Sequence, residues 1–138
     1  MISYELKVES GDEVIEITAE GTIYFAEVFL DTINNDTQKK SNAILARVTI
    51  QGNIDASIND NLIKFSEWAR DLNAKTTYRK VTLTVKKDAT TILRMYEIPD
   101  MFVCDYREVY GNPSDDKTAF FELNLTQKET KLKDFKTC

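Results

Sequence analysis

Alternation of apolar and polar side chains with a period of two restricts the fold of this chain more than any other feature. In residues 44–51, apolar side chains at the even positions alternate with mostly polar ones at the odd positions, and residues 80–86 and 120–125 show the same alternation. Successive residues of a β-strand point to opposite faces of the sheet. This period therefore predicts strands with one buried face.

Seven or eight segments of this kind, rich in β-branched and aromatic residues, are expected to be strands. They span residues 2–8, 14–19, 22–30, 44–51, 81–86, 91–98, 101–110 and 118–127. Pro99-Asp100 is expected to separate two of them, and the four glycines, Gly52 among them, fall between apolar segments where chain reversals occur. No repeat or linker interrupts the pattern, so one mainly β domain over residues 1–138 is expected, with residues 128–138 as a flexible tail.

One segment has a helical period instead. Leu62, Phe65, Ala69 and Leu72 recur at spacings of three and four, which predicts one α-helix over about residues 60–72 with these four side chains as its buried stripe. Asn59 or Asp60 is the expected N-cap, and Trp68 falls at the edge of the stripe.

The chain contains no histidine, which excludes Ser-His-Asp and Cys-His nucleophiles and HExxH zinc sites. Its two cysteines have neither zinc-ligand spacing nor a disulfide framework, and Cys104 is expected to be a buried strand residue while Cys138 is loose. The acidic residues 31–36 lack the glycine and glutamate of a calcium loop. We therefore expect no cofactor, no metal and no enzyme activity.

The formal net charge of -5 and the pI near 4.8 argue against binding to nucleic acid. No apolar run approaches the roughly 18 residues of a membrane span, and the first residues lack the pattern of a signal peptide. The expectation is a chain made in the cytoplasm, without a signal peptide and without membrane insertion.

Two surfaces are candidates for interaction. Several strands carry polar side chains on a second, wet face: Arg47, Thr49, Gln51, Lys80, Thr82, Thr84, Glu122 and Asn124. Residues 31–42 form a polar stretch that predicts the longest loop. A β-domain with exposed strand edges, a wet sheet face and no reactive centre suits self-assembly.

The order of these elements resembles the tube-forming proteins of contractile injection systems, which are the haemolysin-coregulated protein (Hcp) of type VI secretion and the tail-tube proteins of phages. The similarity covers residues 43–127 and lies in the order of strand 43–51, helix 61–70 and strands 81–85, 92–98, 102–110 and 120–125. The similarity is one of element order over the whole domain, and it includes no signature motif.

The resemblance implies an antiparallel β-sandwich or half-open β-barrel that assembles into six-membered rings, which stack into a tube inside a phage-tail-like or secretion particle. In this family a long loop reaches the adjacent ring, and the matching residues here are Asp31, Asn34, Asn35, Asp36, Gln38, Lys39 and Lys40. The wet sheet face is a candidate for the wall of the lumen, and the resemblance leaves open which sheet face lines it. The implied partners are copies of the chain, the sheath and the baseplate, with DNA or protein cargo that is not tightly bound and a particle that is released or fired outside the cell.

Two other functions remain open. The chain could be a monomeric or dimeric β-barrel that binds a small apolar ligand or a partner protein, or an enzyme that uses carboxylates alone. Ring formation separates the tube subunit from both.

Overall fold

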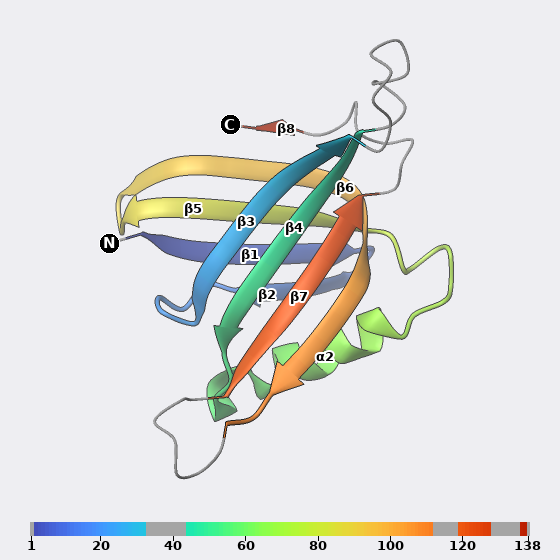
Figure 1. Cartoon of the computed structure of the whole chain (residues 1–138), viewed down its shortest axis with the longest axis horizontal. Helices are drawn as coiled ribbons and strands as arrows, with labels where there is room; N and C mark the ends of the chain where they lie inside the picture. Colours follow the sequence, from blue (N-terminus) through green and yellow to red (C-terminus); the bar gives the residue numbers. More distant parts are fainter. Residues whose placement is uncertain (1, 33–43, 112–118, 128–135, 138) are drawn as a thin grey trace.

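The chain forms one antiparallel sheet that bends into two layers, with a helix beside them (Figure 1). The computed structural model describes residues 2–32, 44–111, 119–127 and 136–137. The elements in these ranges are β1 (Ser3–Ser10), β2 (Glu13–Ile17), β3 (Ile23–Thr32), β4 (Ile44–Asn53), a 3-10 turn η2 (Ala56–Ile58), α2 (Asn59–Ala69), β5 (Arg79–Asp88), β6 (Thr91–Val109), β7 (Phe120–Gln127) and β8 (Lys136–Thr137). Over these ranges the fold is mainly β with one α-helix, in a sheet that does not close, which confirms the predicted fold class.

Within the described residues, the strands lie in the order β2-β1-β5-β6-β7-β4-β3, and β8 pairs with β6. The long strand β6 belongs to both layers, because residues 91–98 pair with β5 whereas residues 101–109 pair with β7. We call β2, β1, β5 and residues 91–98 of β6 the back layer. The front layer is residues 101–109 of β6 with β7, β4 and β3, and it crosses the back layer diagonally in Figure 1.

The bend between the layers lies at Pro99-Asp100, where two separate strands were expected. The prediction was wrong, because β6 runs continuously through this point. Asp100 has a φ of 54°, and the register of β6 against β5 shifts there, so that Ile98 lies opposite Val81 but Met101 lies opposite Arg79. A local irregularity of this kind bends a strand without ending it.

The core lies between the layers and consists of the side chains that alternate inward. The buried apolar residues are Leu6, Val8, Ile15, Ile17, Ile23, Ala46, Val48, Ile50, Ile58, Leu62, Phe65, Trp68, Val81, Leu83, Ile98, Met101, Phe121, Leu123 and Leu125. The inward positions of residues 44–51 and 120–125 that are described here are buried as the alternation predicts.

Gly52 lies inside β4 and not at a reversal as expected. A Cβ atom on Gly52 would lie 2.6 Å from the Phe121 ring and 2.7 Å from the Thr22 carbonyl oxygen. Both distances are shorter than van der Waals contact. The glycine therefore lets the Phe121 ring pack directly on the backbone of the front layer.

Helix α2 begins at Asn59, close to the predicted start at residue 60, but it ends at Ala69, before the predicted end at residue 72. Neither expected residue, Asn59 or Asp60, is the N-cap of α2; that position is Ile58, which makes no side-chain cap. The capping side chain lies one turn earlier, where the Asp55 carboxylate accepts the Ser57 N–H (2.8 Å) at the start of the 3-10 turn η2. Leu62 and Phe65 are buried as predicted, and the Phe65 ring lies 6.1 Å from that of Phe121. Full burial of each such side chain stabilises the fold by about 1.5–3 kcal/mol.

The last residues of the predicted stripe differ from the prediction. Ala69 is only partly buried, and Leu72 lies beyond the helix with 96% of its surface exposed. The side chains of Asp71 and Asn73 accept the N–H groups of Asn73 (2.8 Å) and Lys75 (2.9 Å), which are turn contacts that compete with helical ones. Trp68, expected at the edge, is fully buried.

Of the expected tail, residues 136–137 form β8 opposite Tyr96 and Glu97, and the rest lies outside the described residues. No helix in the described part of the chain has the length and apolar character needed to cross a membrane.

Candidate assembly surface

The outer face of the front layer carries five of the eight residues predicted for the wet face. Arg47, Thr49 and Gln51 project from β4, and Glu122 and Asn124 project from the adjacent strand β7. The register places Thr49 directly opposite Asn124, and Gln51 opposite Glu122. These five side chains therefore form one continuous patch on the side away from the core.

A network of side-chain hydrogen bonds joins this patch, with Glu122 at its centre. The Gln51 amide donates to Glu122 (2.6 Å), as does that of Asn124 (3.0 Å), and the Thr49 hydroxyl donates to Asn124 (2.8 Å). The Arg107 guanidinium of β6 forms an ion pair with Glu122 at 3.4 Å. The Gln51 amide, and with it Asn124 and Arg107, holds the pKa of Glu122 below its usual value. Most polar atoms of the network are thus satisfied within the chain.

An open hollow of about 490 Å³ lies on this face next to the network. Its lining is Glu27, Phe29, Arg47, Val48, Thr49, Cys104, Asp105, Asn124, Leu125 and Thr126. Cys104 is exposed here and hydrogen-bonded to Thr126, which corrects the expectation of a buried residue. The register between β6 and β7 shifts from Val103 to Asp105, and the extra residue in this bulge is Cys104.

The other three predicted wet-face residues lie on the back layer, apart from this patch. Lys80 is exposed and Thr82 is half-buried on the outer face of β5. Thr84 is buried, contrary to the prediction, because it lies between the longer side chains of Glu5 on β1 and Met95 on β6.

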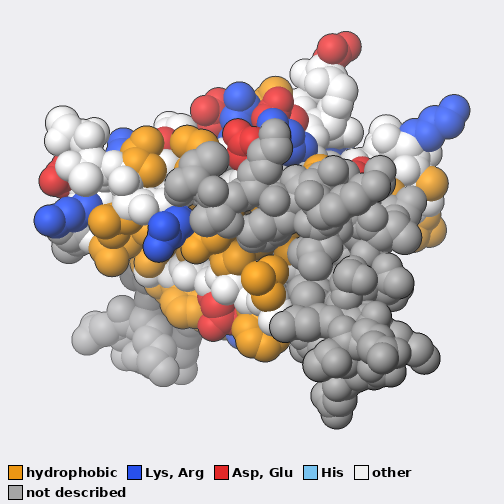
Figure 2. All heavy atoms as spheres, turned by 90° about the horizontal axis from the view of Figure 1, so that it is seen from above, with side chains coloured by type: hydrophobic (Ala, Val, Ile, Leu, Met, Phe, Trp, Pro, Cys, Tyr) orange, Lys and Arg blue, Asp and Glu red, His pale blue; other side chains and the backbone are white. Residues whose placement is uncertain are grey.

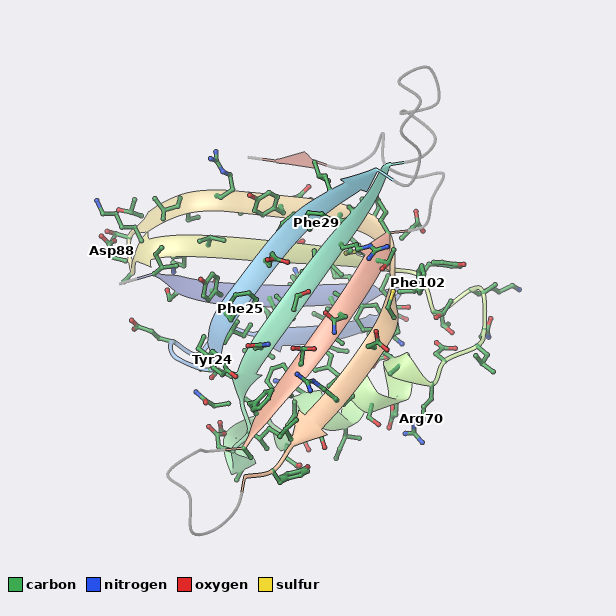
Figure 3. All side chains as sticks on the ribbon, in the orientation of Figure 1. Tyr24, Phe25, Phe29, Arg70, Asp88 and Phe102 are labelled. Carbon is green, nitrogen blue, oxygen red and sulfur yellow. The ribbon has the colours of Figure 1, made fainter. Side chains whose placement is uncertain are left out.

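The front layer ends at β3, a strand of ten residues that pairs only with β4 among the described residues. Tyr24, Phe25, Phe29 and Leu30 along this strand are exposed. Figure 3 shows the three aromatic side chains spaced along this free edge. These residues were not predicted as a contact surface. The three aromatic residues within residues 24–29 were a signal for an exposed apolar surface, but not for its place at a sheet edge.

The opposite edge of the front layer is the second part of β6. Its pairing with β5 ends at Met101, so residues 102–109 pair only with β7 among the described residues. Phe102 begins this open stretch and packs edge-on against Tyr78, with 5.8 Å between the ring centroids. The front layer thus has two unpaired edges.

The free edge of the back layer, β2, is protected. This strand has only five residues, and Glu13 and Glu16 are exposed on it. The Asn61 amide of α2 donates to the Glu16 carbonyl oxygen (3.3 Å), and Arg79 lies 3.8 Å from the Glu13 carboxylate. Shortness, charge and a covering helix are the usual means of blocking an edge strand.

A second group of exposed apolar side chains lies at the end of the β5–β6 hairpin. Ile92 and Leu93 of β6 are exposed there, and so is Ile2 near the start of the chain. Seen from above, hydrophobic and basic side chains gather at this end of the molecule (Figure 2).

The predicted inter-ring loop falls largely outside the described residues. Asp31 lies in β3, opposite Leu45, and not in a loop. Asn34, Asn35, Asp36, Gln38, Lys39 and Lys40 all lie within residues 33–43, which the structure does not describe. In the described ranges, no three Cys, Asp or Glu side chains are grouped so that they could hold a metal ion.

Comparison with protein-family models and with curated protein sequences gives no match. Solved structures do match over nearly the whole chain. A chain of the sheath–tube complex of the extracellular contractile injection system PVC, in its extended state, has a TM-score of 0.59 at 14% identity and covers 96% of this chain and 87% of its own length. An Hcp protein has a TM-score of 0.57 at 9% identity and covers 99% of this chain and 98% of its own.

This chain has an Hcp-type fold. A chain from the six-fold symmetrised baseplate of the anti-feeding prophage shares it, with a TM-score of 0.59 at 8% identity over 99% of this chain and 92% of that one. The Hcp-type fold agrees with the resemblance seen in the order of the sequence elements.

Proposed function

We propose that this chain is a structural subunit that joins copies of itself into rings, and that the rings stack into the inner tube of a phage-tail-like or secretion-type contractile injection particle. The observation that carries the proposal is the front layer, which has a polar outer face and two edges that find no strand partner among the described residues. The Hcp-type fold supports it, because chains of a sheath–tube complex and of a baseplate share this fold.

The two open edges of the front layer run in directions that allow antiparallel pairing between adjacent copies. The front layer has four antiparallel strands, so its first strand β6 and its last strand β3 run in opposite directions. All subunits of a cyclic ring have the same orientation, and each contributes two unlike surfaces to its neighbours. Strand β3 of one copy would therefore meet residues 102–109 of β6 in the next copy as an antiparallel partner. A closed ring of such sheets leaves no edge strand exposed.

The outer face of the front layer would then line the lumen. Its described charged groups are the carboxylates of Glu27, Asp105 and Glu122 and the guanidinium groups of Arg47 and Arg107. A wall with this near-neutral, slightly acidic charge does not attract phosphates, and its hydrogen bonds are largely made within the chain. Such a wall lets DNA or protein cargo pass without holding it.

A ring of six copies is the proposed stoichiometry. It is supported by the six-fold symmetry of the baseplate structure that contains a chain of the same fold. The back layer and α2 would face outward, where sheath and baseplate proteins are the proposed partners. The alternative, a barrel that binds a small apolar ligand, has less support because the hollow on the front layer is lined mainly by polar side chains.

Electron microscopy tests the assembly directly. The purified chain is imaged by negative stain over a series of rising concentrations, with light scattering on the same samples. We expect annular particles or stacked tubes with a stain-filled centre. Monomers or dimers alone, persisting to the highest concentration reached, would contradict the proposal.

A further inference from the structure

The loop between α2 and β5 holds an exposed leucine on a well-ordered support. Asp71 accepts hydrogen bonds from the Asn73 N–H (2.8 Å) and the Thr76 hydroxyl (2.7 Å), and the Thr77 N–H donates to the Asn73 carbonyl oxygen (2.8 Å). The base of the loop is fixed by Trp68, whose Nε1–H donates to the Thr77 carbonyl oxygen (2.7 Å).

The buried guanidinium of Arg79 strengthens this base. It lies 5.2 Å from the centre of the Trp68 ring and 3.8 Å from the Asp71 carboxylate, and its Nε donates to the Thr76 carbonyl oxygen (3.0 Å). Leu72, with 96% of its surface exposed, therefore projects from a loop that its own chain holds in place. A large apolar side chain that is held in place in this way gains free energy when a partner buries it.

A matching apolar residue lies on the other side of the molecule. Leu30 of β3 lies opposite Ala46 of β4, so it points to the core side of the front layer. Its neighbours Val48 and Ala46 are buried, yet Leu30 is 55% exposed at the free edge. In Figures 1 and 3 the loop after α2 and Arg70 lie at one side of the molecule, and β3 lies toward the other.

The antiparallel direction of the proposed pairing would place these two leucines at the same end of the contact between adjacent copies. Because β3 and β6 would pair antiparallel, the start of the open stretch of β6 at Phe102 would lie beside the end of β3, where Leu30 is. Tyr78 packs on Phe102, so the loop that carries Leu72 lies at this end of β6. Helix α2, which leads into the loop, packs on the core side of the front layer through Phe65, the side to which Leu30 points.

We infer that Leu72 of each copy packs against Leu30 of the next copy, as an apolar contact between adjacent subunits of a ring. The inference rests on the proposed ring assembly and adds the specific contact that selects a second copy of this chain as the neighbour. Burial of a leucine side chain from water corresponds to at least about a tenfold change in the association constant for each contact.

Cysteine cross-linking tests the contact. In a background of Cys104→Ser and Cys138→Ser, the variants Leu72→Cys and Leu30→Cys are mixed at high concentration, oxidised, and run on a non-reducing gel. We expect a disulfide-linked pair only in the mixture, and a ladder of oligomers when both changes are in one chain. The matched control replaces Leu30→Cys with Ile63→Cys, a residue of α2 with a similar exposure of 48%, and should give no more than background cross-linking.

Assembly of point variants provides the second readout. Leu72→Asp should weaken ring formation at least about tenfold, whereas Leu72→Met should retain it. Both variants should melt like the parent protein, because Leu72 makes little contact within its own chain.

The outcomes separate the contact from the function. One outcome contradicts the contact alone: the parent protein forms rings, Leu72→Asp forms them equally well, and the Leu72–Leu30 cross-link does not exceed the control. In that case the Leu72–Leu30 contact is wrong, and the proposed ring is not contradicted. If the parent protein forms no rings at any concentration and no cross-link appears, the proposed function fails, and the contact fails with it.

Discussion

The two edge strands of this sheet, β2 and β3, differ in almost every property that governs pairing with another chain. Strand β2 has only five residues, and its glutamates are exposed. The Asn61 amide of α2 donates a hydrogen bond to one of the backbone carbonyl oxygens of β2. Strand β3 has ten residues with exposed aromatic and leucine side chains, and among the described residues it pairs only with β4. Since both edges belong to one sheet, the contrast reveals which one is blocked and which one is available for a partner.

The contrast extends to the faces of the two layers. The back layer carries separate ion pairs on β1 and β5, such as Lys86 with Glu5 at 3.3 Å, whereas polar side chains on the front layer are joined into one network around Glu122. Surface ion pairs of this kind contribute little to stability. The front layer therefore has the more connected polar surface as well as the open edges.

An inward-pointing lysine at the free edge should have the largest effect on assembly. Val28 of β3 is partly buried against the core. In Val28→Lys the side chain of a separate subunit can extend past the open edge to water, but a neighbouring copy would close this path and bury the charge. We expect each contact between copies to lose about 3 kcal/mol or more of association free energy, which lowers its association constant about a hundredfold. Light scattering and microscopy measure the loss of assembly.

The control for this variant is Val14→Lys on β2, where an exposed valine is replaced on the protected edge. It should assemble like the parent protein. Rings of Val28→Lys at parental concentration, or an equal loss with Val14→Lys, would show that β3 is not the pairing edge.

Gly52→Ala should damage the front layer from inside. The added Cβ would meet the Phe121 ring and the Thr22 carbonyl oxygen at 2.6 and 2.7 Å, so the layer must shift. We expect a loss of about 1–3 kcal/mol in the free energy of unfolding, measured by denaturant titration. Adding Phe121→Leu to Gly52→Ala should recover part of this loss. If the two changes in the free energy of unfolding are fully additive, the close contact between Gly52 and the Phe121 ring is contradicted.

The smallest effect concerns Glu122 and depends on pH. Its pKa is lowered in the folded chain, so its contribution is complete above the usual value of 4.5 and is lost as the pH falls through the lower folded value. At pH 7, the free energy of unfolding of Glu122→Gln should be about 1 kcal/mol lower than that of the parent protein. The difference should shrink as the pH drops below 4.5, and a difference that is constant with pH would contradict the role of the carboxylate network.

Local periodicity was sufficient to predict most of the strands and the buried side of β4 and β7. Residues 44–51 and 120–125 show this, because hydrophobic burial acts on the same period of two that the sequence displays. It failed where a local hydrogen bond or a bulge altered the backbone. Asp71 and Asn73, on either side of Leu72, form turn hydrogen bonds in place of helical ones, and a bulge brings Cys104 to the surface.

Features that depend on distant pairing were not predictable from local patterns. The bend of β6 at Pro99-Asp100 divides the sheet into two layers, and it is visible only once β5 and β7 are seen to pair with different parts of the strand. The eight wet-face residues had the same polar pattern, yet this bend places Lys80, Thr82 and Thr84 on a different layer from Thr49. The edge role of β3 likewise follows from strand order and not from its own composition.

Amide hydrogen exchange, compared between dilute and concentrated protein, tests the central claim most directly. We predict that assembly slows exchange in β3 and in residues 102–109 of β6, while exchange in β2 stays unchanged. Slower exchange in β2 with no change in β3 would contradict the account, because the protected edge would then be the one that joins the neighbouring copy.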